Sequence, residues 1–390
     1  MRKEEDQSAN RTRSKAASSR ELAPSLPSAP EMPSILVNPA SDPFQFVRNG
    51  GKKMVNFTVT NFCEATCVYC SFHKQEKKKI VSFDEARMAI DYLAEVNTGV
   101  LSLTGGEPLL NPELPEIIEY ARSKNLIVIT GTNGRLLTRS LAERLHDAGL
   151  NAIWISYESN EREDFERNRG IPGLSQKIAQ ELKHLKEAGV NTFAIALINK
   201  SITDIPKFVE TLLDLGFDKV KFDYPMNFEL ASTYKGWSDS PLLAYSGMEM
   251  EEVISDILKV KAQGRIKVIN PLGGLLGAKD FYNGRVPEFP CFAGKYILYL
   301  DANLDIYRCP ALSEKLGSVG DNIEFGCRDC NLCYYQGARD FGSFYYLLDT
   351  LELLRRGIWK GEAINGLRRL DRRFLRAFLD ADDLRKSGVQ

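Results

Sequence analysis

The sequence predicts an α/β fold around a parallel β-sheet, and two observations indicate it. From Met54 onward, short runs rich in β-branched residues alternate six times with longer amphipathic runs. Several amphipathic runs also carry helix start or stop signals, such as Ser82 before an Asp-Glu pair or a terminal Ala-Gly. Six consecutive βα units fit either a partial barrel or an open doubly wound sheet with right-handed crossovers. In both folds, ligands bind at the carboxyl ends of the strands.

The predicted elements follow one another regularly up to about Pro225. Strands are expected at residues 54–60, 100–104, 127–130, 152–157, 192–198 and 219–223. Helices are expected at 82–95, 112–123, 138–148, 174–188 and 202–215. Residues 226–285 predict loops around one helical piece at 248–263, and residues 295–309 predict a hairpin that turns at 301–303. The sequence from Phe341 on is helical in pattern, and its apolar stretch 341–354 is a candidate cover for a substrate pocket.

Composition limits the class of protein. The chain has 390 residues, is 43% hydrophobic and carries 51 basic against 52 acidic residues. This balance disfavours a broadly electrostatic nucleic-acid binder. There is no apolar run near the roughly 18 residues that span a bilayer, and no signal peptide, so we expect a cytoplasmic protein. Residues 1–48 are rich in Ser, Pro and charge and predict a disordered tail.

Eight cysteines form two groups in this chain. Cys63, Cys67 and Cys70 follow the first predicted strand, and the other five lie beyond residue 290. A reduced compartment makes disulfides improbable, so tight cysteine groups indicate metal binding or catalysis. Three thiolates can hold three irons of a [4Fe–4S] cluster and leave the fourth iron open. The alternative is a structural zinc site, with His73 as the nearby fourth ligand.

The first cysteine group and a second motif resemble the radical S-adenosylmethionine (radical SAM) superfamily. Its C-x3-C-x2-C pattern has Tyr69 before the last cysteine, and 104–108 (TGGEP) after the second strand is similar to the GGEP motif. The resemblance covers roughly residues 52–225 and implies a partial (β/α)6 TIM barrel. It also implies a [4Fe–4S] cluster, bound SAM, and reductive cleavage of SAM to a 5′-deoxyadenosyl radical that abstracts hydrogen from substrate.

The resemblance also implies a set of SAM contacts, although it identifies no catalytic side chain. The implied cofactor-binding residues are Tyr69, Gly105, Gly106, Glu107, Asn133, Ser156 and Arg169. Glu107 would hold the SAM amine, and Arg169 would reach the SAM carboxylate, with Arg167 as its competitor. Glu158 stands where relatives commonly have an Asp-Gly pair, which leaves the ribose contacts open.

The second cysteine group is similar to the SPASM or twitch extensions of radical SAM enzymes. Cys291 and Cys309 flank the predicted hairpin, and Cys327, Cys330 and Cys333 follow it as C-x2-C-x2-C. The similarity implies one auxiliary [4Fe–4S] cluster that assists electron transfer. Four of the five thiols suffice, and we favour Cys327 and Cys330 as partners of Cys291 and Cys309 over Cys330 and Cys333. Structural zinc is the alternative.

These features together predict five segments: a tail at 1–48, a radical SAM partial barrel at 49–230, a connecting region at 231–285, an auxiliary-cluster domain at 286–340 and C-terminal helices at 341–390. The basic amphipathic stretch 365–379 is interpreted as a helix packed on the enzyme body, with membrane-surface contact as the alternative.

The predicted function is a radical SAM enzyme acting on a non-peptide metabolite by oxidation, epimerisation or bond formation. A flavodoxin or ferredoxin is the expected electron donor, and no nucleic-acid partner is expected. One alternative is a peptide-modifying maturase, since the substrate is not readable from these residues. The alternative from another class is a non-catalytic zinc-binding interaction protein.

Overall fold

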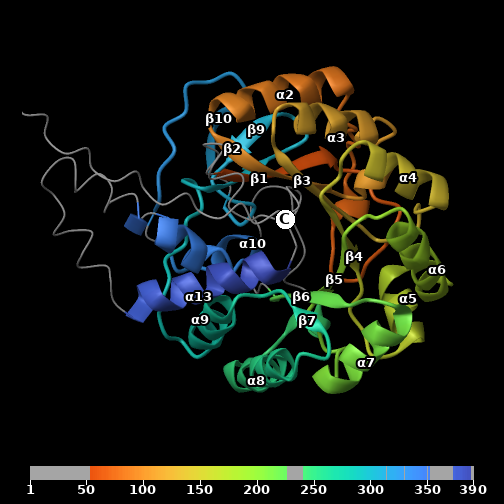
Figure 1. Cartoon of the computed structure of the whole chain (residues 1–390), viewed down its shortest axis with the longest axis vertical. Helices are drawn as coiled ribbons and strands as arrows, with labels where there is room; N and C mark the ends of the chain where they lie inside the picture. Colours follow the sequence, from red (N-terminus) through yellow and green to blue (C-terminus); the bar gives the residue numbers. More distant parts are fainter. Residues whose placement is uncertain are drawn as a thin grey trace, which may run out of the picture. The chain divides into compact units, whose positions relative to one another are not determined.

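Six parallel strands form the centre of the protein, as the sequence predicts. A computed structural model describes residues 53–225, 240–351 except 313, 329 and 349, and 372–387. The strands are β1 (Lys53–Thr60), β2 (Thr98–Gly105), β3 (Ile127–Thr132), β4 (Ala152–Ser156), β5 (Thr192–Leu197) and β6 (Lys219–Asp223). In Figure 1, β1 to β6 form an arc whose outer side is covered by helices. The arc confirms a partial barrel, because each strand pairs in parallel with the next.

The sheet is longer than the six predicted strands. The described strands form one ten-stranded sheet in the order β10-β9-β8-β1-β2-β3-β4-β5-β6-β7. The two-residue strand β7 (Lys267–Val268) pairs in parallel with β6. At the other edge β8 (Ile297–Leu300) pairs in parallel with β1. The sequence gives little sign of either addition, because β7 is very short and the partner of β8 lies more than 240 residues away.

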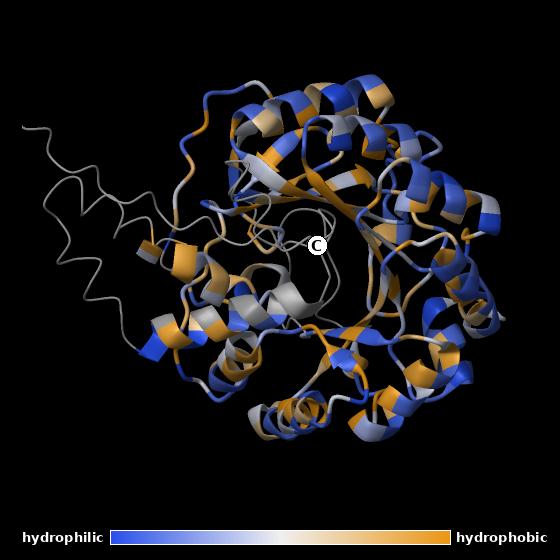
Figure 2. Cartoon of the chain, in the orientation of Figure 1, coloured by the Kyte–Doolittle hydropathy of each residue, from blue (hydrophilic) through white to orange (hydrophobic). Residues whose placement is uncertain are grey.

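Amphipathic helices cover the outer face of the arc. They are α2 (Phe83–Glu95), α3 (Leu114–Ser123), α4 (Arg139–Asp147), α5 (Arg162–Arg169), α6 (Leu174–Glu187), α7 (Ile205–Leu215) and α8 (Gly247–Gln263). The short 3-10 helices η2 (Phe72–Lys74), η3 (Pro108–Leu110) and η4 (Pro241–Leu243) lie in the loops that follow β1, β2 and β6. Ser82 and Glu85 form a capping box at the start of α2, which confirms the predicted helix start. In Figure 2 the strands are mainly hydrophobic, and the helices carry much of the hydrophilic surface.

The predicted hairpin is present. Strands β8 and β9 (Asp305–Tyr307) pair antiparallel, and β10 (Lys315–Ser318) pairs antiparallel with β9. Asp301 stabilises the turn, since its Oδ1 accepts hydrogen bonds from the backbone N–H groups of Asn303 and Asp305, both at 2.9 Å. Because β8 also pairs with β1, the hairpin extends the barrel sheet rather than forming a sheet of its own.

One helix in the predicted connecting region was missed. The loops expected around a single helix at 248–263 are instead interrupted by a second helix, α9 (Leu272–Tyr282). Its sequence, LGGLLGAKDFY, contains three glycines, and glycine lowers helix propensity by about 1 kcal/mol. Those glycines allow close packing: a Cβ at Gly273 would lie 2.5 Å from Asp380 Oδ2, and one at Gly274 would lie 2.4 Å from Asp340 Oδ1.

The C-terminal helices pack on this region. They are α10 (Gln336–Arg339) and α13 (Arg372–Ser387), and residues 342–348 are also helical. Asp380 of α13 is buried and accepts hydrogen bonds from Gly273 N at 3.0 and 3.2 Å. Arg376 forms an ion pair with Glu288, so the predicted packing on the enzyme body is confirmed for the described part of 365–379.

The other predicted boundaries are not tested by this structure. The described residues all belong to one compact unit, residues 38–390, and the predicted tail at 1–48 lies outside the described residues. The division into segments at 49–230, 231–285, 286–340 and 341–390 stays a prediction. In the part of the chain that the structure describes, we find no helix with the length and apolar character to cross a bilayer.

Candidate functional site

A cavity of about 350 Å³ occupies the inside of the arc. One end of it, the cysteine end, lies at the carboxyl ends of β1 to β4. It is lined by every residue predicted for the first cluster and for cofactor contact: Cys63, Cys67, Cys70, Tyr69, Gly105, Gly106, Glu107, Asn133, Ser156 and Arg169. The other end, the β6 end, is formed by Lys221 and Asp223 with residues 335–345. The structure therefore brings together side chains that the sequence spreads over more than 100 residues.

The loop that carries the first three cysteines, residues 61–75, is held at both sides. Asn61 donates from Nδ2 to Lys77 O at 2.8 Å and accepts from Lys79 N at 2.6 Å. Farther along, Thr66 N and Val68 N donate to the carbonyls of Arg169 and Asn168 at 3.1 and 3.0 Å. The second pair of bonds comes from the end of α5, a helix that the sequence analysis missed because REDFERNR is almost entirely polar.

Gly105 and Gly106 allow this loop to approach β2. A Cβ at Gly105 would lie 2.0 Å from Thr60 O, and one at Gly106 would lie 2.1 Å from Phe62 O. The neighbouring backbone is hydrogen-bonded across the same gap, from Gly106 N to Thr60 O at 2.8 Å and from Glu107 N to Phe62 O at 2.9 Å. Both positions therefore require glycine in order to place the cysteine loop, in addition to any cofactor contact.

Glu107 is the centre of a buried polar network at the cysteine end. Its carboxylate accepts hydrogen bonds from Leu109 N at 3.1 Å, Thr132 Oγ1 at 2.8 Å and Asn133 N at 2.7 Å. Burial raises the pKa of Glu107 to about 7, although these three bonds oppose the rise. Asn133 in turn donates to Glu64 Oε1 at 3.1 Å. The network joins the ends of β2 and β3 to the cysteine loop.

Arg169 and Glu158 form a buried ion pair. Arg169 donates from both Nε and Nη2 to the Glu158 carboxylate, and the two residues are 9% and 2% exposed. Glu158, which stands where relatives commonly have an Asp-Gly pair, is therefore paired with Arg169 in this chain. A cofactor bound by Arg169 would share the guanidinium with the Glu158 carboxylate. Arg167, the competing candidate, points to solvent and pairs with Asp164.

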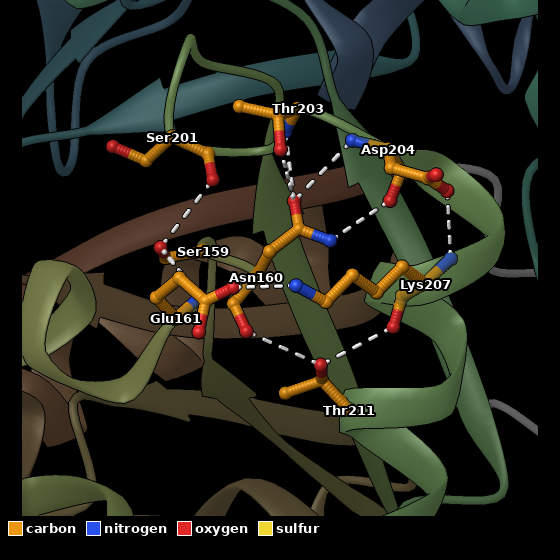
Figure 3. A network of polar contacts seen from close by, with 8 residues as sticks. All are labelled: Ser159, Asn160, Glu161, Ser201, Thr203, Asp204, Lys207 and Thr211. Carbon is orange, nitrogen blue, oxygen red and sulfur yellow. Dashed lines mark hydrogen bonds and ion pairs between the residues drawn. The ribbon is translucent and has the colours of Figure 1, made fainter.

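The loop after β4 that carries Glu158 is fixed by the network in Figure 3. Asn160 Oδ1 accepts from Thr203 N at 2.7 Å, and its Nδ2 donates to Asp204 O at 2.9 Å. Lys207 on α7 reaches Glu161 Oε1 at 2.6 Å. These contacts join the loops after β4 and β5, so they hold Glu158 beside Arg169.

A second, smaller cavity lies among the later cysteines. It is lined by Cys291, Cys309, Cys330 and Cys333 together with Arg308, Arg328 and Arg339. Cys327 does not line it and is exposed, whereas Cys309 is buried and the other three are partly buried. The geometry thus groups Cys330 and Cys333 with Cys291 and Cys309, and differs from the pair that the sequence analysis favoured.

Arg339 holds the second cavity together. It is 3% exposed and donates to Cys330 O at 2.7 Å, Cys333 O at 3.3 Å and Phe289 O at 3.4 Å. Its guanidinium therefore ties the C-x2-C segment to the residue two positions before Cys291. No spacing in the sequence marks this residue, because its contacts are to backbone carbonyls from two distant segments.

Comparison with known proteins matches one segment of the chain to a protein family. Residues 57–215 match the family model described as the radical SAM superfamily. This part of the chain therefore carries a radical SAM domain. The match runs from within β1 to the end of α7, and therefore covers the five strand–helix units from β1 to α7 and ends before β6.

Curated relatives share the radical SAM domain and differ in their chemistry. The Fe-coproporphyrin III synthase of Methanosarcina barkeri is 30% identical over 174 residues, which are 44% of this chain and 43% of that protein. The PqqA peptide cyclase of Granulibacter bethesdensis is 27% identical over 183 residues, 46% of this chain and 47% of that protein. The matched part thus spans less than half the length of these relatives.

Solved radical SAM structures share the fold. The structure described as native anSMEcpe with bound AdoMet has a TM-score of 0.55 and 14% identity, covering 69% of this chain and 79% of that one. Streptococcus suis SuiB bound to S-adenosylmethionine has a TM-score of 0.55 and 14% identity, covering 70% and 64%. At this identity the likeness shows the architecture alone, and it confirms the partial-barrel prediction.

The radical SAM family implies a [4Fe–4S] cluster and SAM, and the residues of the cysteine end fit both. Three thiols face one cavity beside the glycines and Glu107. Burial raises the pKa of Cys67 to about 12 and also raises the pKa values of Cys63 and Cys70. The free thiols are therefore neutral at pH 7, and coordination to iron would supply the charge that holds them as thiolates. Among the described residues, no three His, Cys, Asp or Glu side chains are grouped closely enough for a single metal ion.

The structure also places residues that the sequence analysis missed or misjudged. Lys221, Asp223 and Tyr335 line the main cavity, while His73 does not. Lys221 and Asp223 are alternate residues at the end of a predicted strand, which is a signal for cavity-facing side chains. Tyr335 lines both cavities, a position that follows only from the packing of residues 335–345 against the hairpin.

Proposed function

We propose that this chain is an enzyme that cleaves SAM reductively and uses the resulting 5′-deoxyadenosyl radical to abstract a hydrogen atom from a substrate bound in the main cavity. Cys63, Cys67 and Cys70 would hold the [4Fe–4S] cluster. The observation that carries the proposal is the convergence of these thiols with the GGEP segment on one cavity at the carboxyl ends of the strands. Cluster and SAM supply the radical chemistry, and the chain positions the reactants and excludes water.

The cysteine end is suited to hold SAM by its polar groups. Gly105 and Gly106 present backbone without side chains, and Ser156 faces the cavity from the end of β4. Glu107 is a hydrogen-bonded carboxylate that can accept from the SAM amine. Because Arg169 is already paired with Glu158, we assign it to positioning the Tyr69 side of the loop, where its guanidinium lies 5.9 Å from the Tyr69 ring centroid.

We further propose that the second cavity holds an auxiliary [4Fe–4S] cluster. Its ligands would be Cys291, Cys309, Cys330 and Cys333, because these four line one cavity and Cys327 does not. Four thiolates close all four irons, so this cluster would have no open position for SAM. The three arginines around the cavity favour an anionic thiolate cluster. Its role would be to take up or deliver an electron during turnover.

The main cavity supports a small-molecule substrate. Its volume of about 350 Å³ has to be shared between SAM and the substrate, which favours a compact substrate. Phe341, Phe344 and Tyr345 line its β6 end, which supports a role of this segment as a cover over the substrate. A peptide substrate is the alternative, and it would have to enter this cavity with a single side chain.

Anaerobic reconstitution of the full chain tests the proposed function. We expect a brown protein with about eight irons per chain that forms 5′-deoxyadenosine from SAM when dithionite supplies electrons. A flavodoxin or ferredoxin would replace dithionite in the cell. A colourless protein that binds zinc and leaves SAM intact would overturn the proposal in favour of a non-catalytic zinc protein.

A further inference from the structure

The two ends of the main cavity differ in how their charges are paired. At the cysteine end, Glu107 accepts three hydrogen bonds and Glu158 pairs with Arg169. At the β6 end, Asp223 lies at the carboxyl terminus of β6 and lines the cavity. Its Oδ1 is buried and has no hydrogen-bond partner among the described residues. A buried carboxylate oxygen without a partner costs about 1–3 kcal/mol, so it marks a place where a donor is missing.

Asp223 is supported by a second buried carboxylate. Asp340 is fully buried, lines the same cavity and has a partnerless Oδ1 in the described structure. Its Oδ2 accepts from Asn270 Nδ2 at 2.8 Å and Gln336 Nε2 at 2.9 Å. Asn270 also bonds to both the N–H and the carbonyl of Phe222, at 2.7 and 2.8 Å. Asp340 is thereby tied to β6 directly beside Asp223.

The β6 end has two acidic side chains, Asp223 and Asp340, and one basic side chain, Lys221. Burial is the main cause that raises the pKa of Asp223 to about 7, and the nearby carboxyl groups of Asp340 and Glu158 contribute to the rise. Lys221 lines the same end and lowers the pKa values of both acids, but its Nζ lies over the Phe341 ring, 5.0 Å from the centroid, and no ion pair joins it to either acid in the described structure. Two carboxyl groups therefore share one ammonium that is ion-paired with neither, and a bound cation would stabilise their ionised forms.

The walls around this charged spot are apolar. The hydrophobic lining residues on the strands and on the segments that follow β6 are Ile127, Ile129, Trp154, Phe193, Ile195, Ile269, Phe344 and Tyr345. Such a surface gains free energy by burying an apolar body, at roughly 25 cal/mol per Å². A ligand that fits this end would therefore carry one polar group on an apolar body.

We propose that the β6 end of the cavity binds the substrate through a cationic nitrogen, an ammonium or guanidinium group carried on an apolar body, with Asp223 as its direct acceptor. This inference rests on the proposed function, because it places the substrate beside the SAM site. Asp340 acts as a positioning residue that fixes the β6 end and adds negative potential. The opposite assignment, an anionic substrate held by Lys221, is the outcome that the test must distinguish.

A series of three matched ligands tests the assignment on the reconstituted full-length chain with SAM bound. The ligands are 2-phenylethylamine, 2-phenylethanol and 3-phenylpropionate, and their affinities are measured by anaerobic calorimetry. We expect the amine to bind at least about ten-fold more tightly than the alcohol, and the propionate to bind most weakly. Tightest binding of the propionate, or equal binding of all three, would overturn the proposal.

A pair of variants makes the test specific to Asp223. Asp223→Asn should reduce the preference for the amine over the alcohol to within about two-fold. The matched control is Asp218→Asn, an exposed residue directly before the opposite end of β6, which should leave the preference unchanged. A preference that survives Asp223→Asn contradicts the proposal. Should that variant not fold, the ligand series on the wild-type chain still decides.

The same preparation separates this inference from the proposed function. Iron content and 5′-deoxyadenosine formation by the wild-type chain report the proposed function and do not depend on the three ligands. A chain that loads iron and cleaves SAM but prefers the propionate would disprove only the substrate assignment. A chain that neither loads iron nor cleaves SAM would disprove the proposed function itself.

Discussion

The two cysteine groups of this protein differ in how many chain segments build them. Cys63, Cys67 and Cys70 come from one continuous loop, which is fixed by the ends of β2 and α5 and faces the large cavity. Cys291, Cys309, Cys330 and Cys333 come from three separated segments around a small cavity. If these thiols are cluster ligands, three from one loop would leave room for a further molecule, whereas four from three segments would surround their cluster.

This difference bears on what each site depends on. The loop of the first group is placed by local backbone contacts, and the glycines at 105 and 106 permit the approach. The second group depends on long-range packing, in which Arg339 joins residues on either side of the hairpin. We therefore expect the first site to be lost when its cysteines are replaced. The second site should also be weakened when a residue that holds its segments together is replaced.

The largest expected effect comes from removing the first group. Replacing Cys63, Cys67 and Cys70 together by Ala should abolish 5′-deoxyadenosine formation, since no other described thiols face the main cavity. Iron should fall from about eight to about four per chain, because the second site is built from different segments. Iron analysis and chromatography of the SAM products measure both effects. Reductant-dependent 5′-deoxyadenosine from this variant would show that the first site is wrongly assigned.

The next effect distinguishes the two possible ligand sets of the second group. Cys333→Ala should lose about four irons per chain. Cys327→Ala is the matched control and should keep the iron of wild type, because Cys327 is exposed and does not line the second cavity. The opposite result would restore the set with Cys327 that the sequence analysis favoured.

The contrast between the groups also explains which elements and site residues could be predicted from the sequence. The six strands were predicted to within two residues at every end, because runs such as 127–130 are short and rich in β-branched residues and the strands alternate regularly with amphipathic runs. All predicted residues of the cysteine end line one cavity, because the carboxyl ends of consecutive parallel strands meet at one edge. Local pattern and topology were sufficient there.

Elsewhere the deciding contacts are long-range. The helix α9 was missed because its glycines serve packing against Asp340 and Asp380 and lower its helix propensity. The choice between Cys327 and Cys333 could not be made from C-x2-C-x2-C, since the spacing is the same in both directions from Cys330. The pairing of Glu158 with Arg169, and the exposure of Asp223 and Tyr335 to the cavity, depend on elements that the sequence does not place.

The smallest effect tests the framework of the second site without touching a thiol. Arg339→Lys keeps the positive charge but cannot reach the carbonyls of Phe289, Cys330 and Cys333 at once. A hydrogen bond to a charged group contributes about 1.5–3 kcal/mol, so we expect the free energy of unfolding to fall by about 2–3 kcal/mol. Denaturant unfolding of the metal-free chain measures this loss, and iron retention during dialysis measures its consequence for the cluster.

The matched control for Arg339 lies on the same cavity. Arg328 also lines it, but its side chain is 60% exposed and reaches Glu314 only at 3.5 Å. Exposed ion pairs contribute about 0–1 kcal/mol, so Arg328→Lys should leave both unfolding and iron retention close to wild type. If neither variant loses unfolding free energy or iron, the arginines act through their charge alone, because lysine keeps that charge. A loss of unfolding free energy and iron in Arg339→Lys alone would instead show that the guanidinium joins the segments through its hydrogen bonds. The second cysteine group would then depend on long-range packing, whereas the loop of the first group is held by local backbone contacts.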